Sequence, residues 1–186
     1  MALACFEEWL NPNGISLEEA RRFDEFPLYW LGETYDGYDL NEINSWGSEP
    51  GDEYYTEPGV TITYGEETCA ENSSNCLTPI WIDIEPYCQS SPEETLAWLE
   101  HLLTLPEYGD YTISEAEVRG VKAYRFGESR TYLWTASSAI IVDANTADLR
   151  TMQVAEDLIP ISEDSDTTQE PPPPPVSTSC PETPGA

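Results

Sequence analysis

The sequence has few basic residues, with seven Lys and Arg against 36 Asp and Glu and a formal net charge of −29 at pH 7. Lys122 is the only lysine. Five of the acids follow residue 160, so the part before it still carries 31 acids against seven bases. Such a surface repels phosphate backbones and anionic lipids, which excludes nucleic acid as a partner. Binding of cations or a cationic partner and adaptation to high salt are the two explanations that remain open.

Histidine is nearly absent as well, and His101 is the only one. A Ser-His-Asp or Cys-His catalytic arrangement would have to use this histidine, and the G-x-S-x-G motif of a nucleophilic serine does not occur in the sequence. Its place in a leucine-rich helical segment is typical of a surface or boundary residue. No apolar run approaches the length of a transmembrane helix, about 20 residues. We therefore expect a protein that is not an enzyme and that uses no cofactor.

The spacing of the cysteines is the most informative feature for the compartment, since three of the five lie between positions 69 and 88. Since no metal motif accompanies them, they predict an oxidising compartment. The β-rich runs Val60–Tyr64 and Ile80–Ile84 flank a polar loop that ends in Cys69 and Cys76. We expect a hairpin closed by a Cys69–Cys76 disulfide in preference to a zinc site. Cys88 can pair with Cys5 or with Cys180, or the pairings among Cys69, Cys76 and Cys88 can exchange. The sequence does not distinguish these possibilities.

The two ends of the chain differ in composition from its middle. Ala2-Leu3-Ala4-Cys5 resembles the end of a bacterial lipoprotein signal, so we expect lipid attachment at Cys5 if the true start lies upstream. A short N-terminal segment with Cys5 free to pair is the alternative. Residues 161–186 are acidic and then proline-rich, which predicts a disordered tail.

Between these ends, residues 16–160 predict a single α+β domain. Capping boxes at Ser16 with Glu19 and at Ser91 with Glu94 predict helices that end near Phe26 and Leu105. Asn145 predicts the cap of a third helix, which reaches residue 159. Alternating or continuous apolar runs predict six strands, at 27–31, 60–64, 80–84, 118–126, 131–135 and 139–143. The expected fold is a mostly antiparallel sheet of about six strands with two to three helices packed on one face.

Residues 33–59 break this pattern, since they are rich in Gly, Pro, Asp and Asn. Either a short strand lies near Tyr38–Ile43, or the segment is a binding loop. Its aromatic residues can pack it down or bind a cationic or glycan ligand; they are Tyr35, Tyr38, Trp46, Tyr54 and Tyr55. Its polar residues give two further hypotheses, a calcium site and a small hydrolase with paired carboxylates. The calcium ligands would be Asp36, Asp39, Asn41 and Glu42, although their order is not that of an EF-hand.

Several short motifs together resemble uncharacterised secreted or lipid-anchored bacterial domains. They are FPLYWLG, VTITYG, the Cys69–Cys76 pair followed by PIWI, and Pro86-Tyr87-Cys88. The later segments VRGVKAYRF, TYLWTASSAIIVDA and AEDLI resemble the strand-and-helix module of periplasmic lipoprotein-carrier-like domains. Glu66-Glu67 departs from the tightest form of the pattern. The resemblance implies compartment and fold but no mechanism. We expect a non-catalytic, extracytoplasmic binding or assembly domain with a protein partner at a membrane or cell surface.

Overall fold

The computed structural model describes residues 14–47, 58–69, 76–86, 91–135, 138–146 and 148–161. Of the predicted site residues, Cys5, Tyr54, Tyr55, Cys88 and Cys180 lie outside these ranges, as does all but the first residue of the predicted tail. None of the helices in the described ranges is long and apolar enough to cross a membrane.

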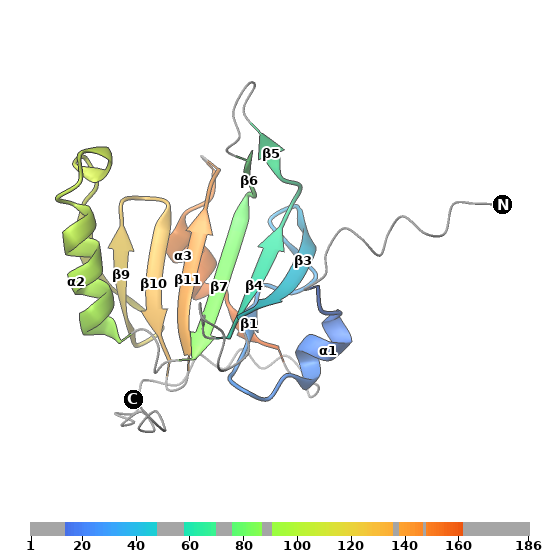
Figure 1. Cartoon of the computed structure of the whole chain (residues 1–186). Coiled ribbons are helices and arrows are strands. Elements are labelled where there is room, and N and C mark those ends of the chain that lie inside the picture. The colour runs from blue at the N-terminus through green and yellow to red at the C-terminus, as the bar shows by residue number, and fades with distance from the viewer. Residues whose placement is uncertain are drawn as a thin grey trace.

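One eight-stranded sheet dominates the fold (Figure 1). Every pairing in it is antiparallel, in the order β2-β3-β4-β7-β11-β10-β9-β8. Its strands are β2 Thr34–Tyr35, β3 Tyr38–Trp46, β4 Gly59–Tyr64, β7 Ile80–Pro86, β8 Ile113–Val118, β9 Val121–Phe126, β10 Arg130–Trp134 and β11 Ser138–Ala144. The prediction of an α+β fold with an antiparallel sheet is confirmed. The expected number of about six strands is too low for this sheet.

Two tight turns account for strands that the sequence analysis missed. Asp36 and Gly37 have φ values of 48° and 87° and join β2 to β3, while Arg119 and Gly120 have 52° and 83° and join β8 to β9. Positive φ at both central residues is the geometry of a two-residue hairpin turn, whose twist matches that of the flanking strands. The expected strand 118–126 is confirmed as β9 from Val121 onward, but its start is wrong, because the chain reverses at Arg119 and Val118 ends β8. The expected strand near Tyr38–Ile43 is confirmed as β3.

The helices begin where their caps predict, with one exception. Ser16 and Glu19 form the capping box of α1, Leu17–Arg22, and Ser91 and Glu94 form that of α2, Pro92–Leu102. Both helices are shorter than predicted. The third helix, α3, covers only Thr151–Glu156 and starts after Arg150, with no side-chain cap. Asn145 is not a helix cap; its amide donates to the carbonyl oxygen of Thr78 at 3.0 Å.

The helices pack on both faces of the sheet, so the expectation that they share one face is wrong. Leu133 packs in the core cluster that includes Ala20 of α1 and Val154 of α3. Its neighbour Trp134 packs instead in the cluster that includes Leu99 of α2. Because successive strand residues point to opposite faces, α2 lies on the face opposite α1 and α3 (Figure 1). Strands β10 and β11 are buried on both faces, and this pattern does not say which face a helix will cover.

Two short strand pairs flank the main sheet. Strand β1, Tyr29–Trp30, pairs with β12, Ile159–Pro160, and is the buried core of the predicted strand 27–31. The buried Tyr64 hydroxyl on β4 holds this pair in place, since it accepts from the Leu31 amide at 2.8 Å and donates to the Gly32 carbonyl at 3.0 Å. The second pair, β5 Thr68–Cys69 with β6 Cys76–Leu77, projects beyond the ends of β4 and β7 (Figure 1).

Candidate binding face

Helix α2 covers only part of its face of the sheet. Under it, Tyr124, Tyr132 and Trp134 of β9 and β10 are buried around Leu99. Farther across the same face, Trp81, Asp83, Arg130 and Asp143 lie outside this cluster, and Ile141 of β11 packs against its edge. We call this part the open strip. It consists of Trp81, Asp83, Arg130, Ile141 and Asp143, and it lies between α2 and the β5–β6 hairpin (Figure 1).

Strand register explains why these residues meet. Trp81 on β7 lies opposite Asp143 on β11, and Asp143 lies opposite Arg130 on β10. In an antiparallel pair, opposite residues point to the same face, with Cβ atoms about 4.5–5.5 Å apart. A row of three side chains from three strands therefore crosses the sheet at one level. Asp83 and Ile141 form the next row, since they are also opposite one another.

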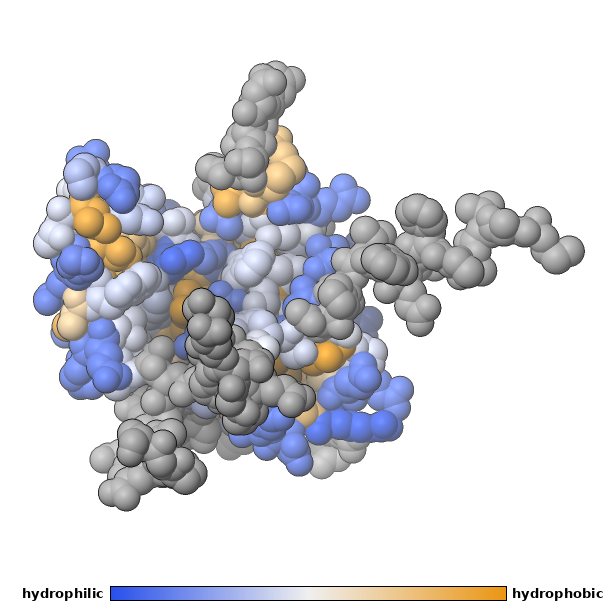
Figure 2. Space-filling model, viewed as in Figure 1, coloured by the Kyte–Doolittle hydropathy of each residue, from blue (hydrophilic) through white to orange (hydrophobic). Residues whose placement is uncertain are grey.

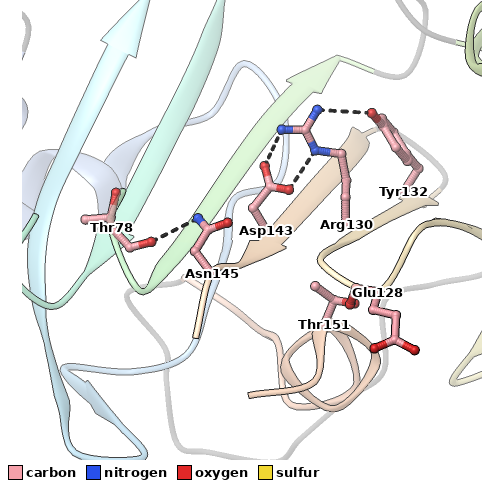
Figure 3. Close-up of polar contacts among 7 residues, drawn as sticks. All are labelled: Thr78, Glu128, Arg130, Tyr132, Asp143, Asn145 and Thr151. Carbon is pink, nitrogen blue, oxygen red and sulfur yellow. Dashed lines mark hydrogen bonds and ion pairs between the residues drawn. The ribbon is translucent and has the colours of Figure 1, made fainter. Parts of the chain in front are cut away.

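An arginine–aspartate pair occupies the centre of the open strip (Figure 3). Arg130 donates from Nε to Asp143 Oδ1 at 2.6 Å and from Nη2 to Oδ2 at 2.7 Å. Its Nη1 lies 3.5 Å from the Tyr132 hydroxyl oxygen, to which it donates. The hydrogen bonds to Asp143 raise the pKa of the guanidinium, against the effect of burial. Because this geometry is bidentate, it fixes the planar guanidinium more firmly than a single contact would.

A second polar chain runs from β3 to β7 beside this pair. Trp46 Nε1 donates to Thr61 Oγ1 at 3.1 Å, and Thr61 Oγ1 donates to Asp83 Oδ1 at 2.5 Å. Burial raises the pKa of the Asp83 carboxyl, although the Thr61 hydrogen bond acts in the opposite direction. Nearby Asp143 raises it further, and Arg130 lowers it. Asp83 is thus a half-buried acid whose protonation depends on its burial, on its hydrogen bonds and on the neighbouring charges.

Two hollows adjoin the open strip. The first holds about 290 Å³ and is lined by residues of the strip and of the β5–β6 hairpin, namely Cys76, Leu77, Thr78, Trp81, Asp83, Arg130, Asp143 and Asn145. The second, of about 210 Å³, lies against α2 and includes Trp98, Tyr132 and Ile141. Three large apolar side chains around the hollows are exposed to solvent, Leu77 by 53%, Trp98 by 48% and Trp81 by 38%. Figure 2 shows orange patches at α2 and beside the hairpin on a mostly hydrophilic face.

The arrangement is suited to binding a macromolecular surface. Tryptophan and arginine are enriched among residues that dominate protein–protein binding energy. Arg130 has five N–H donors, of which three are used by Asp143 and Tyr132 in the described part of the chain. Its side chain is 40% exposed, so the remaining donors can reach a partner. Trp81 offers an aromatic surface on the other side of Asp143.

The predicted disulfide is confirmed. Cys69 and Cys76 are bonded and lie opposite one another in the β5–β6 pair, with Cα atoms 4.0 Å apart. The bond therefore closes the end of the long hairpin formed by β4 and β7, as the flanking β-rich runs predict. It also positions Leu77 and Thr78 at the margin of the open strip.

The predicted aromatic ligand site is only partly within the described chain. Tyr35 and Tyr38 are half-buried and pack against the core. The Tyr35 hydroxyl donates to Asp157 at 2.7 Å, and burial, this bond and nearby acids raise its pKa. Trp46 lies over Gly59, close enough that a Cβ at residue 59 would clash with its ring. Tyr35 and Trp46 thus each contact another part of the fold, Tyr35 at Asp157 and Trp46 at Gly59 of β4.

The residues predicted for calcium are all exposed. Asp36 lies in the β2–β3 turn, and the other three follow on β3, where a register shift occurs between Leu40 and Glu42. Within the described ranges, no three or more His, Cys, Asp or Glu side chains gather closely enough to hold a metal ion. His101 is exposed on α2, the surface position that the sequence predicts.

The sequence analysis did not identify the open strip. One pattern could have indicated part of it: in IWIDIEP the isoleucines alternate with Trp81, Asp83 and Glu85, which predicts a strand with one apolar and one polar face. The pairing of Arg130 with Asp143 follows from register across a hairpin, which alternation alone does not provide.

Neither the protein-family models, nor the curated proteins, nor the solved structures contain a significant match to this chain.

Proposed function

We propose that this protein is a non-catalytic, extracytoplasmic domain that binds or assembles with a protein partner at a membrane or cell surface, using the open strip. One observation carries the proposal. Trp81 is 38% exposed beside the Arg130–Asp143 pair, on the same sheet face where α2 buries the neighbouring aromatic residues. Leu77 and Trp98 are also exposed around the two adjoining hollows, so a partner that covers this face would remove several apolar side chains from water.

Charge indicates what kind of partner fits. The net charge of −29 attracts a basic surface from a distance and speeds its encounter with the protein. In the open strip itself, the half-buried carboxylate of Asp83 can receive a cationic side chain, and Trp81 can stack on it. The partner that suits this face best therefore carries Lys or Arg around an apolar centre. The Cys69–Cys76 disulfide supports the oxidising compartment in which we place the complex.

The proposal is tested by co-purification of the full chain from its native cells, with Trp81→Ala compared with wild type. The expected result is that a defined partner is retained by wild type and reduced at least tenfold in the variant, as for a central interface residue. Tyr111→Ala is the matched control, since Tyr111 is a similarly exposed aromatic residue, at 41%, that lines neither of the two hollows. A partner lost equally in both variants, or in neither, would contradict the assignment of the open strip.

The alternatives from the sequence remain predictions. A carboxylate-dependent hydrolase would use Asp36 and Asp39, which the structure places in and beside an exposed hairpin turn. Replacing both by Asn should abolish any glycan hydrolysis if that hypothesis is right. A calcium, cationic-ligand or glycan module of residues 33–59 would be detected as a ligand-dependent change in Trp46 fluorescence.

A further inference from the structure

The seven basic residues differ in what they contact. Within the described residues, Arg21 pairs with Glu33, Arg22 with Glu18, Lys122 with Glu115, and Arg130 with Asp143. Arg119 donates to the main-chain oxygens of Glu156 and Leu158. The two that remain, Arg125 and Arg150, have no carboxylate partner within the described residues. In a chain with five times as many acids as bases, two such arginines need an explanation.

Both arginines line the same hollow, which holds about 760 Å³. It lies on the α3 side of the sheet, between the β9–β10 turn, the end of β11 and the start of α3, and it shares only Asn145 with the hollow beside the open strip. Figure 3 shows two of its walls, where Thr151 of α3 lies beside Glu128 of the turn. Its polar lining also includes Ser129, Asn145 and Thr146. A volume of this size falls in the range of small-molecule sites, about 300–1,000 Å³.

Unsatisfied polar atoms gather around this hollow. Within the described chain, four buried side-chain polar atoms lack a hydrogen-bond partner, and Arg125 Nε and Thr146 Oγ1 are two of them. A third is Thr131 Oγ1, whose residue is fully buried and lies directly opposite Arg125 in the β9–β10 pair. A buried donor without a partner costs about 1–3 kcal/mol, so such atoms are rare unless a ligand or water completes them.

We propose that this hollow binds a small organic carboxylate, held by Arg125 and Arg150. Two guanidinium groups around one space repel each other. A carboxylate bound between them attracts both and accepts hydrogen bonds from their N–H groups. The surrounding hydroxyl and amide groups suit a ligand that also carries hydroxyl groups. A carboxylate fits better than a phosphate, because every additional negative charge is repelled by a protein of net charge −29. Glu128 at the edge of the hollow adds to this selection against multiply charged anions.

Isothermal titration calorimetry of the full chain at constant ionic strength tests this proposal, with glucuronate, acetate and inorganic phosphate as probes. The expected result is saturable binding of glucuronate, weaker binding of acetate and the weakest binding of phosphate. Absence of saturable binding by all three probes would overturn the proposal. Phosphate binding more tightly than glucuronate would overturn the assignment to carboxylates.

Variants locate the binding in the hollow. Arg125→Gln and Arg150→Gln should each weaken glucuronate at least tenfold, whereas Arg22→Gln removes the same charge from an exposed ion pair and should change the affinity less than twofold. Glu128→Gln should strengthen binding severalfold. Equal losses in Arg125→Gln and Arg22→Gln would contradict the site.

A spectroscopic readout is independent of variant stability. In ¹⁵N-labelled wild-type protein, the Nε–H resonance of Arg125 should shift on addition of glucuronate, because the side chain lines the hollow and its buried Nε has no hydrogen-bond partner among the described residues. The Arg22 resonance should not shift. A titration in which the Arg125 resonance stays fixed at saturating glucuronate would refute the contact.

Discussion

Two halves of one sheet face are built in different ways. Under α2, the side chains of β9 and β10 are aromatic and buried, with Trp134 1% exposed and Tyr124 2% exposed. On the open strip, neighbouring strands place an ion pair, a hydrogen-bonded aspartate and a half-exposed tryptophan. Both halves share β10 and β11, so the difference lies in which residues the strands present and not in the backbone.

The comparison separates stability from recognition. Burial of aromatic surface stabilises the folded state by about 25 cal/mol per Å², whatever the partner of that surface is. Hydrogen-bonded charges near solvent contribute little net stability, yet they fix positions and can select a partner. We therefore expect substitutions in the α2-covered half to change folding, and substitutions in the open strip to change binding.

The largest effect is expected in the covered half. Leu99→Ala removes a fully buried side chain between α2 and the sheet and should lower the free energy of unfolding by about 2–5 kcal/mol. Leu77→Ala, at the margin of the open strip, is the matched control and should change it by less than about 0.5 kcal/mol because Leu77 is 53% exposed. Urea unfolding measures both. Similar losses in the two variants would remove the distinction between the halves.

The disulfide should come next. Replacing Cys69 and Cys76 by Ser opens a short loop, and the chain-entropy model gives a loss of about 2.5 kcal/mol. Because this effect acts mainly on the unfolded chain, the near-UV circular dichroism of the aromatic residues under α2 should be unchanged. A changed spectrum would mean that the hairpin also supports the covered half.

The central ion pair should contribute less. Asp143→Asn keeps the shape but removes the charge that Arg130 faces, and we expect a loss of about 1–2 kcal/mol because the pair is partly exposed to water. Glu18→Gln breaks the exposed pair with Arg22 and should cost no more than about 0.5 kcal/mol. Denaturant titration of both variants compares the two pairs. Equal small losses would mean that the bidentate geometry contributes nothing to folding.

The smallest effect concerns pH. Burial raises the pKa of Asp83 in the folded protein, so the folded state keeps a proton that the unfolded state has released. The stability that Asp83 contributes is therefore complete at low pH and falls as pH rises from about 4 through its folded pKa. Asp83→Asn has no such dependence. Unfolding free energies at several pH values should show wild type losing stability relative to this variant as pH rises. A constant difference would contradict the shift.

Local rules in the sequence predict much of the fold but little of the site. The capping boxes at Ser16 and Ser91 and the disulfide follow from short-range spacing, and each is present in the structure. The hairpin turn at Arg119-Gly120 was missed because its flanking residues form a continuous β-rich run. Asn145 was mistaken for a helix cap because asparagine is common at caps. Its side-chain amide instead donates to the main-chain oxygen of Thr78.

The open strip depends on contacts between distant parts of the chain. Trp81 meets Asp143 only because β7 pairs with β11, two strands separated by α2, β8, β9 and β10 in the sequence. Strand order in an antiparallel sheet follows from which faces can be buried together, and the sequence gives too little information to select it. The same applies to the hollow around Arg125, whose walls come from three separate elements.

Photo-crosslinking in intact native cells tests the central account most directly. A benzoylphenylalanine in place of Trp81 is compared with one in place of Glu18, which is exposed on α1. The account predicts one discrete protein adduct at position 81, weakened by Arg130→Gln, and none at position 18. The same adduct at both positions, or none at position 81 from a folded protein, would contradict a binding role for the open strip.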